Sequence, residues 1–390
     1  MPTPKLADYT PEDLEALHRR FLDDLRSSPN NLSFWFPKVR DCGIRVPKTH
    51  VIPVPEDVHD AFYMENGDAD YKRIAAFVHE KVMPVVDALP GLPFIKNGCF
   101  SDKFDFNRCC PADKDEKTII ESITDIQYES LCFDTGGSLE IIIRERIPSP
   151  EDMPRIYGGM PLNTEFRLFY DFDLHEPLYL VNYWDRGYCR DTIAGRSPLD
   201  GEAFDNRWPS LHAEYLRSAS SVFVDASRAL MGVKGLAGQW SVDFLLDADG
   251  TLWLIDMAVA RQSAYWDTVK AKLASVGDRI EDFVTAQGLP SLKSEFVGCF
   301  VLEKEGMMKT ITERFAQAWR KAVLDGKDFV MENLPDNELT QKGLELLKTY
   351  RKRTETATDE DLYNTFKRKA ESLEEILLAI AIENYLLTRK

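Results

Sequence analysis

The 390-residue sequence has no hydrophobic run long enough to cross a bilayer. Its longest clean apolar run is ILLAIAI, at residues 376–382, whereas a transmembrane helix needs about 20 apolar residues. The N-terminal stretch MPTPKLADYTPEDLEALHRR also lacks the apolar centre of a secretory signal peptide. We therefore expect no membrane partner and a cytoplasmic location.

Cysteine and histidine are scarce and scattered. No pair among the seven cysteines has the spacing of zinc ligands, and Cys109 and Cys110 are adjacent. The six histidines form no HExxH motif and no recognisable catalytic triad. Because disulfides persist mainly in oxidising compartments, we expect a reduced, intracellular chain. We expect structural roles for the histidines.

Positive charge is also in deficit. The chain has 48 lysines and arginines against 65 aspartates and glutamates, which gives a net charge of -17. Such acidity excludes broad contact with nucleic-acid phosphates, so we expect no nucleic-acid partner. The net negative charge does not exclude a local basic pocket that binds a nucleotide. The GxxxxGK[ST] loop of P-loop proteins and the HRD and DFG motifs of protein kinases are absent, which excludes those two nucleotide sites.

The patterns that are present predict an α+β protein. At 44% hydrophobic residues, the chain can form two or three compact lobes. Periodicity and capping residues predict helices, and β-branched or alternating runs predict strands. The expected helices begin at Thr10-Pro11 and cover about 68–88, about 209–235 and much of the chain after 268; the expected strands are PFIKNGCF, LEIIIRERI, the antiparallel pair TEFRLFYDFD and LYLVNYW, and a hairpin at 241–258.

The hairpin SVDFLLDADGTLWLIDMA, residues 241–258, carries one aspartate inside each strand. Asp243 and Asp256 flank an Asp-Gly turn at similar distances, so strand pairing can bring them together. Facing carboxylates repel unless they are protonated, paired with a cation or bound to metal. One alternative is that an aspartate faces solvent or pairs with Arg261. The other is a Mg²⁺ site, because Mg²⁺ takes one or two carboxylates plus water and phosphate oxygens.

Further charged residues precede the hairpin along the chain, on or beside predicted strands. They are Lys96 and Lys103, then Arg144, Glu145 and Arg146, then Glu165 and Arg167. An isolated lysine in a strand commonly faces solvent. As a set, however, basic groups that can meet phosphates and acids that can hold Mg²⁺ are the components of an ATP site.

In order and spacing, the lysine strand, the buried strand ending in Arg-Glu, the EFR motif and the D…DG..W.ID hairpin resemble the ATP-grasp superfamily. The chain is most similar to the clade named for one arginine and two lysines, and it also resembles the cell division cycle protein 123 family. The resemblance covers roughly residues 92–268. It implies an ATP-grasp core with two lobes at 91–145 and 146–268, an N-terminal helical and extended region at 1–90, and a helical region at 269–390.

The resemblance also implies roles for single residues. Lys96 and Lys103 would contact the α- and β-phosphates of ATP, with Lys96 and Arg167 as the catalytic residues. The segment from Arg144 to Ile147, which includes Glu145 and Arg146, would offer backbone groups to adenine. Arg167 would face the terminal phosphate, and Glu165 would orient it or a lysine. Asp243 and Asp256 would ligate Mg²⁺.

Two functions follow from this resemblance. The first is a Mg²⁺-ATP-dependent ligase that joins a carboxylate to an amine through an acyl phosphate, on an unidentified acceptor such as a peptide or protein. The second is an ATP-binding assembly factor that organises a protein partner with little turnover. Ala258 bears on the choice, because the superfamily often has an asparagine ligand two positions after the second acid. Arg261, Gln262 or Ser263 could serve substrate or phosphate instead.

Overall fold

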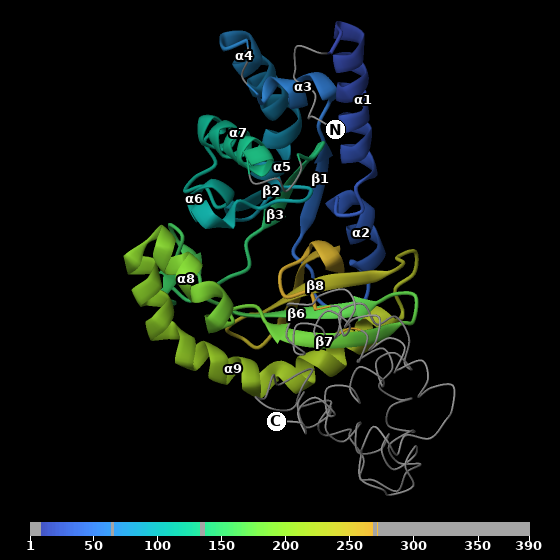
Figure 1. The fold of residues 1–390 in the computed structure, drawn as a ribbon. Helices are drawn as coiled ribbons and strands as arrows, with labels where there is room; N and C mark the ends of the chain where they lie inside the picture. The colour runs from blue at the N-terminus through green and yellow to red at the C-terminus, as the bar shows by residue number, and fades with distance from the viewer. Residues whose placement is uncertain (1–8, 64–65, 133–136, 268–270, 272–390) are drawn as a thin grey trace, which may run out of the picture. The chain divides into compact units, whose positions relative to one another are not determined.

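The computed structural model describes residues 9–63, 66–132, 137–267 and 271 (Figure 1). The chain divides into two compact units. The first comprises Met1–Arg167, Asn182–Tyr215 and Arg228–Ala260, and the second comprises Leu168–Val181, Leu216–Ser227 and Arg261–Lys390. The helical predictions after residue 268, including the amphipathic C-terminal helix, lie outside the described residues.

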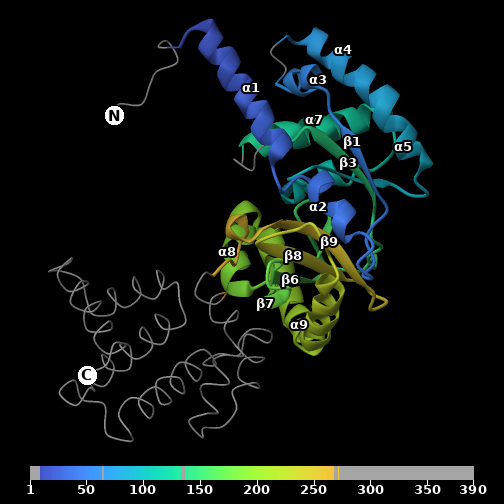
Figure 2. The ribbon, with the colours of Figure 1, turned by 90° about the vertical axis from the view of Figure 1, so that its right-hand side faces the viewer.

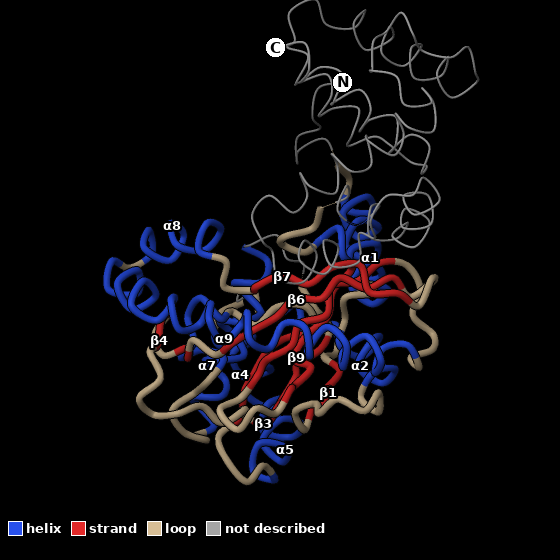
Figure 3. Tube along the Cα trace, turned by 90° about the horizontal axis from the view of Figure 1, so that it is seen from below, coloured by secondary structure: helices blue, strands red, loops and turns tan. Residues whose placement is uncertain are grey.

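Helices and antiparallel sheets are both present, which confirms the predicted α+β class (Figures 1 and 3). The α-helices are α1 (Pro11–Ser27), α2 (Leu32–Val39), α3 (Glu56–Ala61), α4 (Asp68–Phe77), α5 (Met83–Ala88), α6 (Phe106–Cys109), α7 (Glu116–Cys132), α8 (Arg186–Arg196) and α9 (Pro198–Met231). The strands are β1 (Thr49–Pro53), β2 (Pro93–Asn97), β3 (Glu140–Glu145), β4 (Arg155–Ile156), β5 (Met160–Pro161), β6 (Thr164–Asp171), β7 (Glu176–Asn182), β8 (Gln239–Leu246) and β9 (Leu252–Val259). None of the helices in the described ranges could serve as a membrane span.

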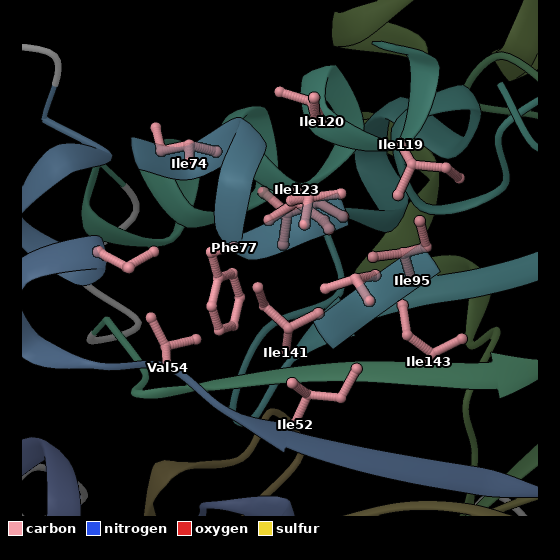
Figure 4. Close-up of a cluster of buried hydrophobic side chains, with 14 of the residues drawn as sticks. Ile52, Val54, Ile74, Phe77, Ile95, Ile119, Ile120, Ile123, Ile141 and Ile143 are labelled. Carbon is pink, nitrogen blue, oxygen red and sulfur yellow. The ribbon is translucent and has the colours of Figure 1, made fainter. Parts of the chain in front are cut away.

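A three-stranded antiparallel sheet of order β1-β3-β2 lies in the first unit. Its central strand β3 is the β-branched run EIIIRE, and it is buried along most of its length, as the sequence predicts. Helices α4, α5 and α7 cover one face of the sheet (Figure 2). Phe77 of α4 and Ile123 of α7 point toward Ile141 of β3 in the resulting core (Figure 4). This core fixes β2 and β3, which carry Lys96 and Arg144 to the site described below.

The N-terminal helices follow their sequence signals. Thr10 and Asp13 form a capping box at the start of α1, with Pro11 in the first turn. The helix predicted over about 68–88 is present as α4 and α5, but a π-helical turn at Val78–Val82 separates them. Pro84 lies just after that turn and has no backbone N–H to continue an α-helical ladder, which accounts for the irregular turn.

In the first unit, strands β6, β8 and β9 are neighbours in that order. Strand β6 belongs to this unit as far as Arg167. Strands β8 and β9 form the predicted antiparallel hairpin. Gly250 has a φ of 78° in its turn, and the Asp247 carboxylate accepts hydrogen bonds from the backbone N–H groups of Asp249 and Thr251. Asp247 therefore serves the turn, as expected, and leaves Asp243 and Asp256 as the acids that need another explanation.

One helix prediction was wrong at its start. The helix expected over about 209–235 begins at Pro198, because Ser197 caps the backbone N–H of Asp200 and Pro198 occupies the first helical position. Pro209 lies inside α9 and does not end it. The predicted helix began only at about residue 209 and so lacked the first turns of α9.

The described part of the second unit contains the second half of β6, with β7 as its neighbour in the sheet. Aromatic side chains form its core. The rings of Phe169 and Tyr179 lie 4.5 Å apart, and Trp266 packs 5.3 Å from Phe169. The aromatics of these two strands therefore pack against one another.

Candidate functional site

A cavity of about 380 Å³ opens in the first unit, and all of its lining residues belong to that unit. This volume is within the range of small-molecule sites. Its cationic lining residues are Lys96, Lys103, Arg144, Arg146 and Arg155, and its acidic ones are Glu145, Glu165, Asp243 and Asp256. In a chain with a net charge of -17, a lining with so many cations marks a place where an anion can bind.

Asp243 and Asp256 are direct register partners across β8 and β9. Directly opposed residues place their side chains on the same face of an antiparallel pair, and both aspartates line the cavity. The register shifts just beyond Asp243, where a β-bulge lies between it and Phe244. Bulges commonly redirect side chains beside functional sites. The predicted alignment of Asp243 and Asp256 across the hairpin is thus present.

Each of these carboxylates pairs with a different cation. Asp243 accepts two hydrogen bonds from the Arg167 guanidinium, both at 2.7 Å, and both side chains are 11% exposed. Asp256 accepts a hydrogen bond from the Lys96 ammonium at 2.9 Å. The pairing with Arg261 that the sequence left open is therefore replaced by pairs with Arg167 and Lys96. These two pairs remove the repulsion expected between facing acids.

Lys96 is a buried charge on β2, with a side chain 2% exposed. It lies next to Ile142 of β3 in the strand register, so its aliphatic part packs within the sheet while its ammonium reaches Asp256. The Asp256 side chain is 40% exposed. Burial opposes ionisation of Asp256, but Lys96 and, more weakly, Arg144 outweigh it and lower the pKa of that carboxyl. The alternative in which Lys96 faces solvent is wrong.

Tyr183 lies between two cations of the site. The Lys103 ammonium donates a hydrogen bond to its hydroxyl and lies 4.2 Å from the ring centroid, and the Arg167 guanidinium lies 4.9 Å from the same centroid. Both distances are within the range of cation–π contacts. Burial lowers the pKa of Lys103, while the nearby carboxylates of Glu165 and Asp243 oppose that shift. Tyr183 thus fixes the positions of two predicted phosphate-binding groups.

Glu165 lies on β6 two residues before Arg167, and the two side chains share a strand face. It is 9% exposed. Burial raises its pKa to about 7, with Lys103 opposing and Asp243 reinforcing the shift. Glu165 therefore changes its charge near neutral pH, inside the cavity.

The strand end of β3 is held by side chains that bond to backbone groups. Arg144, 5% exposed, donates to the Ile255 carbonyl at 2.7 Å and to Thr49 at 3.1 Å. Burial lowers its pKa to about 10. The Glu145 carboxylate accepts from the Lys48 backbone N–H at 2.7 Å. Arg144 thereby ties β3 to β9, and the backbone leaves β3 along the cavity at Arg146 and Ile147.

The structure brings the predicted residues together: all of them line the cavity except Arg167, which reaches it through Asp243. Sequence reasoning missed Tyr183, Arg155, Asn163 and Cys110. Tyr183 lies near the end of the predicted strand LYLVNYW, where nothing local separates it from the other aromatic residues. Arg155 belongs to the two-residue strand β4, which is too short to leave a periodic signal. The adjacent glycines of the β4–β5 turn were the available sign of a tight structure there.

Within the described residues, no group of three or more histidine, cysteine, aspartate or glutamate side chains is placed to hold a metal ion. Asp243 and Asp256 are register partners, and both line the cavity. Two carboxylates fit Mg²⁺, which completes its shell with water and phosphate oxygens. They suit calcium less, since calcium takes six to eight oxygen ligands. The donor set therefore fits Mg²⁺ that arrives with a phosphate ligand.

No protein-family model matches the chain, and no curated protein is significantly similar to it.

Proposed function

We propose that the cavity binds Mg²⁺-ATP and that the chain is an ATP-dependent ligase of the ATP-grasp type, joining a carboxylate to an amine. One observation carries this proposal above the others: Asp243 and Asp256 are opposed in register on the cavity wall, and each is paired with a cation, Arg167 or Lys96. A purely structural hairpin gains little from two such pairs, because desolvating two ion pairs offsets most of their attraction. A phosphate and Mg²⁺ site uses all four groups.

The cations would bind and orient the polyphosphate. Lys96 and Lys103 are held by Asp256 and Tyr183, so their ammonium groups are already fixed before a ligand enters. Arg167, held by Asp243 and the Tyr183 ring, would face the terminal phosphate. Such preorganised positive charge stabilises the charge that develops on a transferring phosphoryl group.

Asp243 and Asp256 would hold Mg²⁺, which supplies neutralisation of phosphate charge. Glu165 would orient Arg167 or Lys103, and its ionisation near neutral pH would tune that role. The apolar wall beside the Arg146–Ile147 segment, which includes Phe94 and Met160, suits a flat adenine ring. In the reaction, a substrate carboxylate would attack the terminal phosphorus as ADP leaves, and an amine would then displace phosphate from the acyl phosphate.

A second candidate function is an ATP-binding assembly factor that contacts a protein partner and turns over little. Ala258 favours it, because its methyl side chain cannot ligate a metal where a third ligand would stand. Because the described residues offer two carboxylates and no third acidic ligand, we expect the site to bind one Mg²⁺. Binding of ATP is common to both candidates, and turnover separates them.

Titration calorimetry of the full chain with ATP and Mg²⁺ tests the shared proposal. We expect saturable binding that Asp256→Asn weakens by about tenfold or more in the presence of Mg²⁺. Asp249→Asn, which changes an exposed acid of the hairpin turn, should leave binding intact. ADP release is then measured with panels of carboxylates, amines and peptides. Release that requires both a carboxylate and an amine supports the ligase. Tight binding without release in any panel supports the assembly factor, and no binding at all contradicts both.

A further inference from the structure

Cys110 is a thiol in the wall of the candidate site, and it follows directly on a second cysteine. Cys109 ends α6 and is fully buried, whereas Cys110 is 9% exposed and lines the cavity. The backbone N–H of Cys110 donates to the Phe106 carbonyl at 2.8 Å, which fixes the residue at the end of the helix. Both cysteines are free thiols. A reagent would therefore reach Cys110 through the cavity.

Two arginines of the cavity lie around this thiol. Arg146 donates to the Pro93 carbonyl at 2.9 Å and also to the carbonyl of Pro111, the residue that follows Cys110. Arg155 is held by the Gly159 carbonyl at 2.9 Å. Neither guanidinium forms a salt bridge with a carboxylate in the part of the chain that the structure describes. Because both residues line the cavity and no paired carboxylate among the described residues offsets their charge, they favour an anion there.

The surroundings of Cys110 give its thiol a different pKa from those of Cys109 and Cys99. The adjacent Cys109 thiol, together with the positive charge of Arg146 and Arg155, outweighs burial and lowers the pKa of Cys110, while the pKa of Cys109 rises. Burial instead raises the pKa of Cys99 to about 11. Reactive cysteines occur in electropositive, accessible places, and redox-sensitive ones often have a second thiol beside them. Cys110 meets both conditions.

We propose that Cys110 is a reactive thiol through which peroxides modify this cavity, with Cys109 as the resolving thiol. The Cys110 thiolate attacks one peroxide oxygen, the O–O bond breaks, and hydroxide leaves, so that Cys110 becomes a sulfenic acid. The Cys109 thiol then attacks the Cys110 sulfur, an S–S bond forms, and water leaves. Two thiols lose two electrons in total, and hydrogen peroxide takes them up.

The product would be a readily reversed disulfide. Adjacent Cα atoms lie about 3.8 Å apart, below the usual range of about 4.4–6.8 Å for disulfides, and such deviations make the bond easier to reduce. Its formation moves the backbone next to Pro111, whose carbonyl anchors Arg146. Oxidation should therefore weaken anion binding in the cavity, and a dithiol reductant should restore it.

The test treats the folded full-length chain with hydrogen peroxide, blocks the remaining thiols, and identifies tryptic peptides by mass spectrometry. Residues 109–114, CCPADK, form one such peptide. We expect this peptide to lose two hydrogens at a peroxide dose about tenfold below the dose that oxidises the exposed Cys132 or the buried Cys99. Oxidation of Cys132 before CCPADK, or of CCPADK only after unfolding, overturns the proposal.

Two variants check the assignment of roles. Cys110→Ser should leave Cys109 reduced, and Cys109→Ser should trap Cys110 as sulfenic or sulfinic acid, because its resolving thiol is gone. Oxidation of Cys109 in the Cys110→Ser variant contradicts the assignment. If either variant fails to fold, the rate of wild-type alkylation by iodoacetamide gives the same ranking of Cys110, Cys99 and Cys132.

A final experiment rests on the proposed function. Saturating Mg²⁺-ATP should slow modification of Cys110 by about tenfold or more and leave Cys132 unchanged, because ligand and reagent share one cavity. Full protection supports both proposals. Rapid oxidation of CCPADK in a chain that shows no ATP binding by calorimetry refutes the ATP proposal alone, and ATP binding with an inert Cys110 refutes the thiol proposal alone.

Discussion

Asp243 and Asp256 stand opposite each other on β8 and β9, yet each is neutralised by a cation from another strand. Asp243 takes Arg167 of β6 at 2.7 Å, and Asp256 takes Lys96 of β2 at 2.9 Å. Both hairpin acids therefore have a cation partner before any ligand binds. On binding of Mg²⁺-ATP, the two carboxylates would bind the metal, and Arg167 and Lys96 would bind the phosphates instead. Stability, pH dependence and metal dependence should all reflect this exchange.

The Lys96–Asp256 pair should be asymmetric in its effect on stability. Lys96 is 2% exposed, so Asp256→Ala leaves a buried ammonium without its partner and should lower the free energy of unfolding by about 3 kcal/mol. Lys96→Met leaves a carboxylate that is 40% exposed and hydrated, and should cost about 1 kcal/mol or less. Denaturant titration of both variants measures the difference. Asp249→Ala is the control, with an expected change within about 0.5 kcal/mol. Equal losses for the two variants would contradict the asymmetry.

Glu165 should make stability fall as the pH rises toward neutral. Its pKa is raised by burial from the ordinary 4.5 to about 7, so in that window the folded chain binds more protons than the unfolded chain. The unfolding free energy contributed by this group therefore decreases from pH 4.5 to pH 7, and the penalty is complete above that range. Glu165→Gln should remove this slope. The difference between wild type and variant in denaturant titrations across the window measures it, and parallel curves would refute the raised pKa.

Part of this arrangement could be predicted from the sequence, because its signals are local. An aspartate inside an apolar strand conflicts with burial wherever the strand packs, so Asp243 and Asp256 are conspicuous. The Asp-Gly turn fixes the hairpin and brings the pair together. The β-branched run of β3 likewise predicts a buried strand, and the buried strand is present.

The rest depends on contacts between distant segments, which carry no local signal. Nothing in PFIKN shows that the Lys96 side chain reaches a residue 160 positions later. Tyr183 directly follows strand β7, and only the fold shows that its ring meets Lys103 and Arg167. Helix α9 begins before Pro209 and continues through it, although local propensity disfavours a proline inside a helix.

Tyr183 should act as a positioning residue for the phosphate-binding cations. Tyr183→Phe removes the hydroxyl that accepts from Lys103 but keeps the ring, whereas Tyr183→Ala also removes the cation–π contacts with Lys103 and Arg167. We expect Mg²⁺-ATP affinity to fall by about threefold for the first variant and about tenfold or more for the second. Calorimetry gives both values. Tyr188→Phe, an exposed tyrosine on α8, is the matched control and should bind as wild type does. Equal affinity for all three variants would exclude the positioning role.

Mg²⁺ and ATP should bind with strong mutual coupling. ATP alone must pull Lys96 and Arg167 from their carboxylates and leave two uncompensated acids beside its phosphates, while Mg²⁺ alone must leave two uncompensated cations. Together they satisfy all four groups. We expect the ATP affinity to rise by about tenfold or more when excess Mg²⁺ replaces EDTA, and the Mg²⁺ affinity to rise by the same factor with ATP, since coupling free energies are reciprocal.

The coupling can be assigned to the site by substitution. Asp243→Asn removes one metal ligand and the charge that holds Arg167, so ATP should then bind with nearly the same affinity in Mg²⁺ and in EDTA. Asp249→Asn, in the exposed turn of the same hairpin, should retain the full increase in ATP affinity that Mg²⁺ causes. Because Mg²⁺ also binds ATP in solution, the titrations are repeated at several Mg²⁺ concentrations and fitted to the Mg²⁺-ATP complex as ligand. A wild-type affinity that is the same with and without Mg²⁺ would show that Asp243 and Asp256 hold only Arg167 and Lys96, and that the hairpin acids are structural.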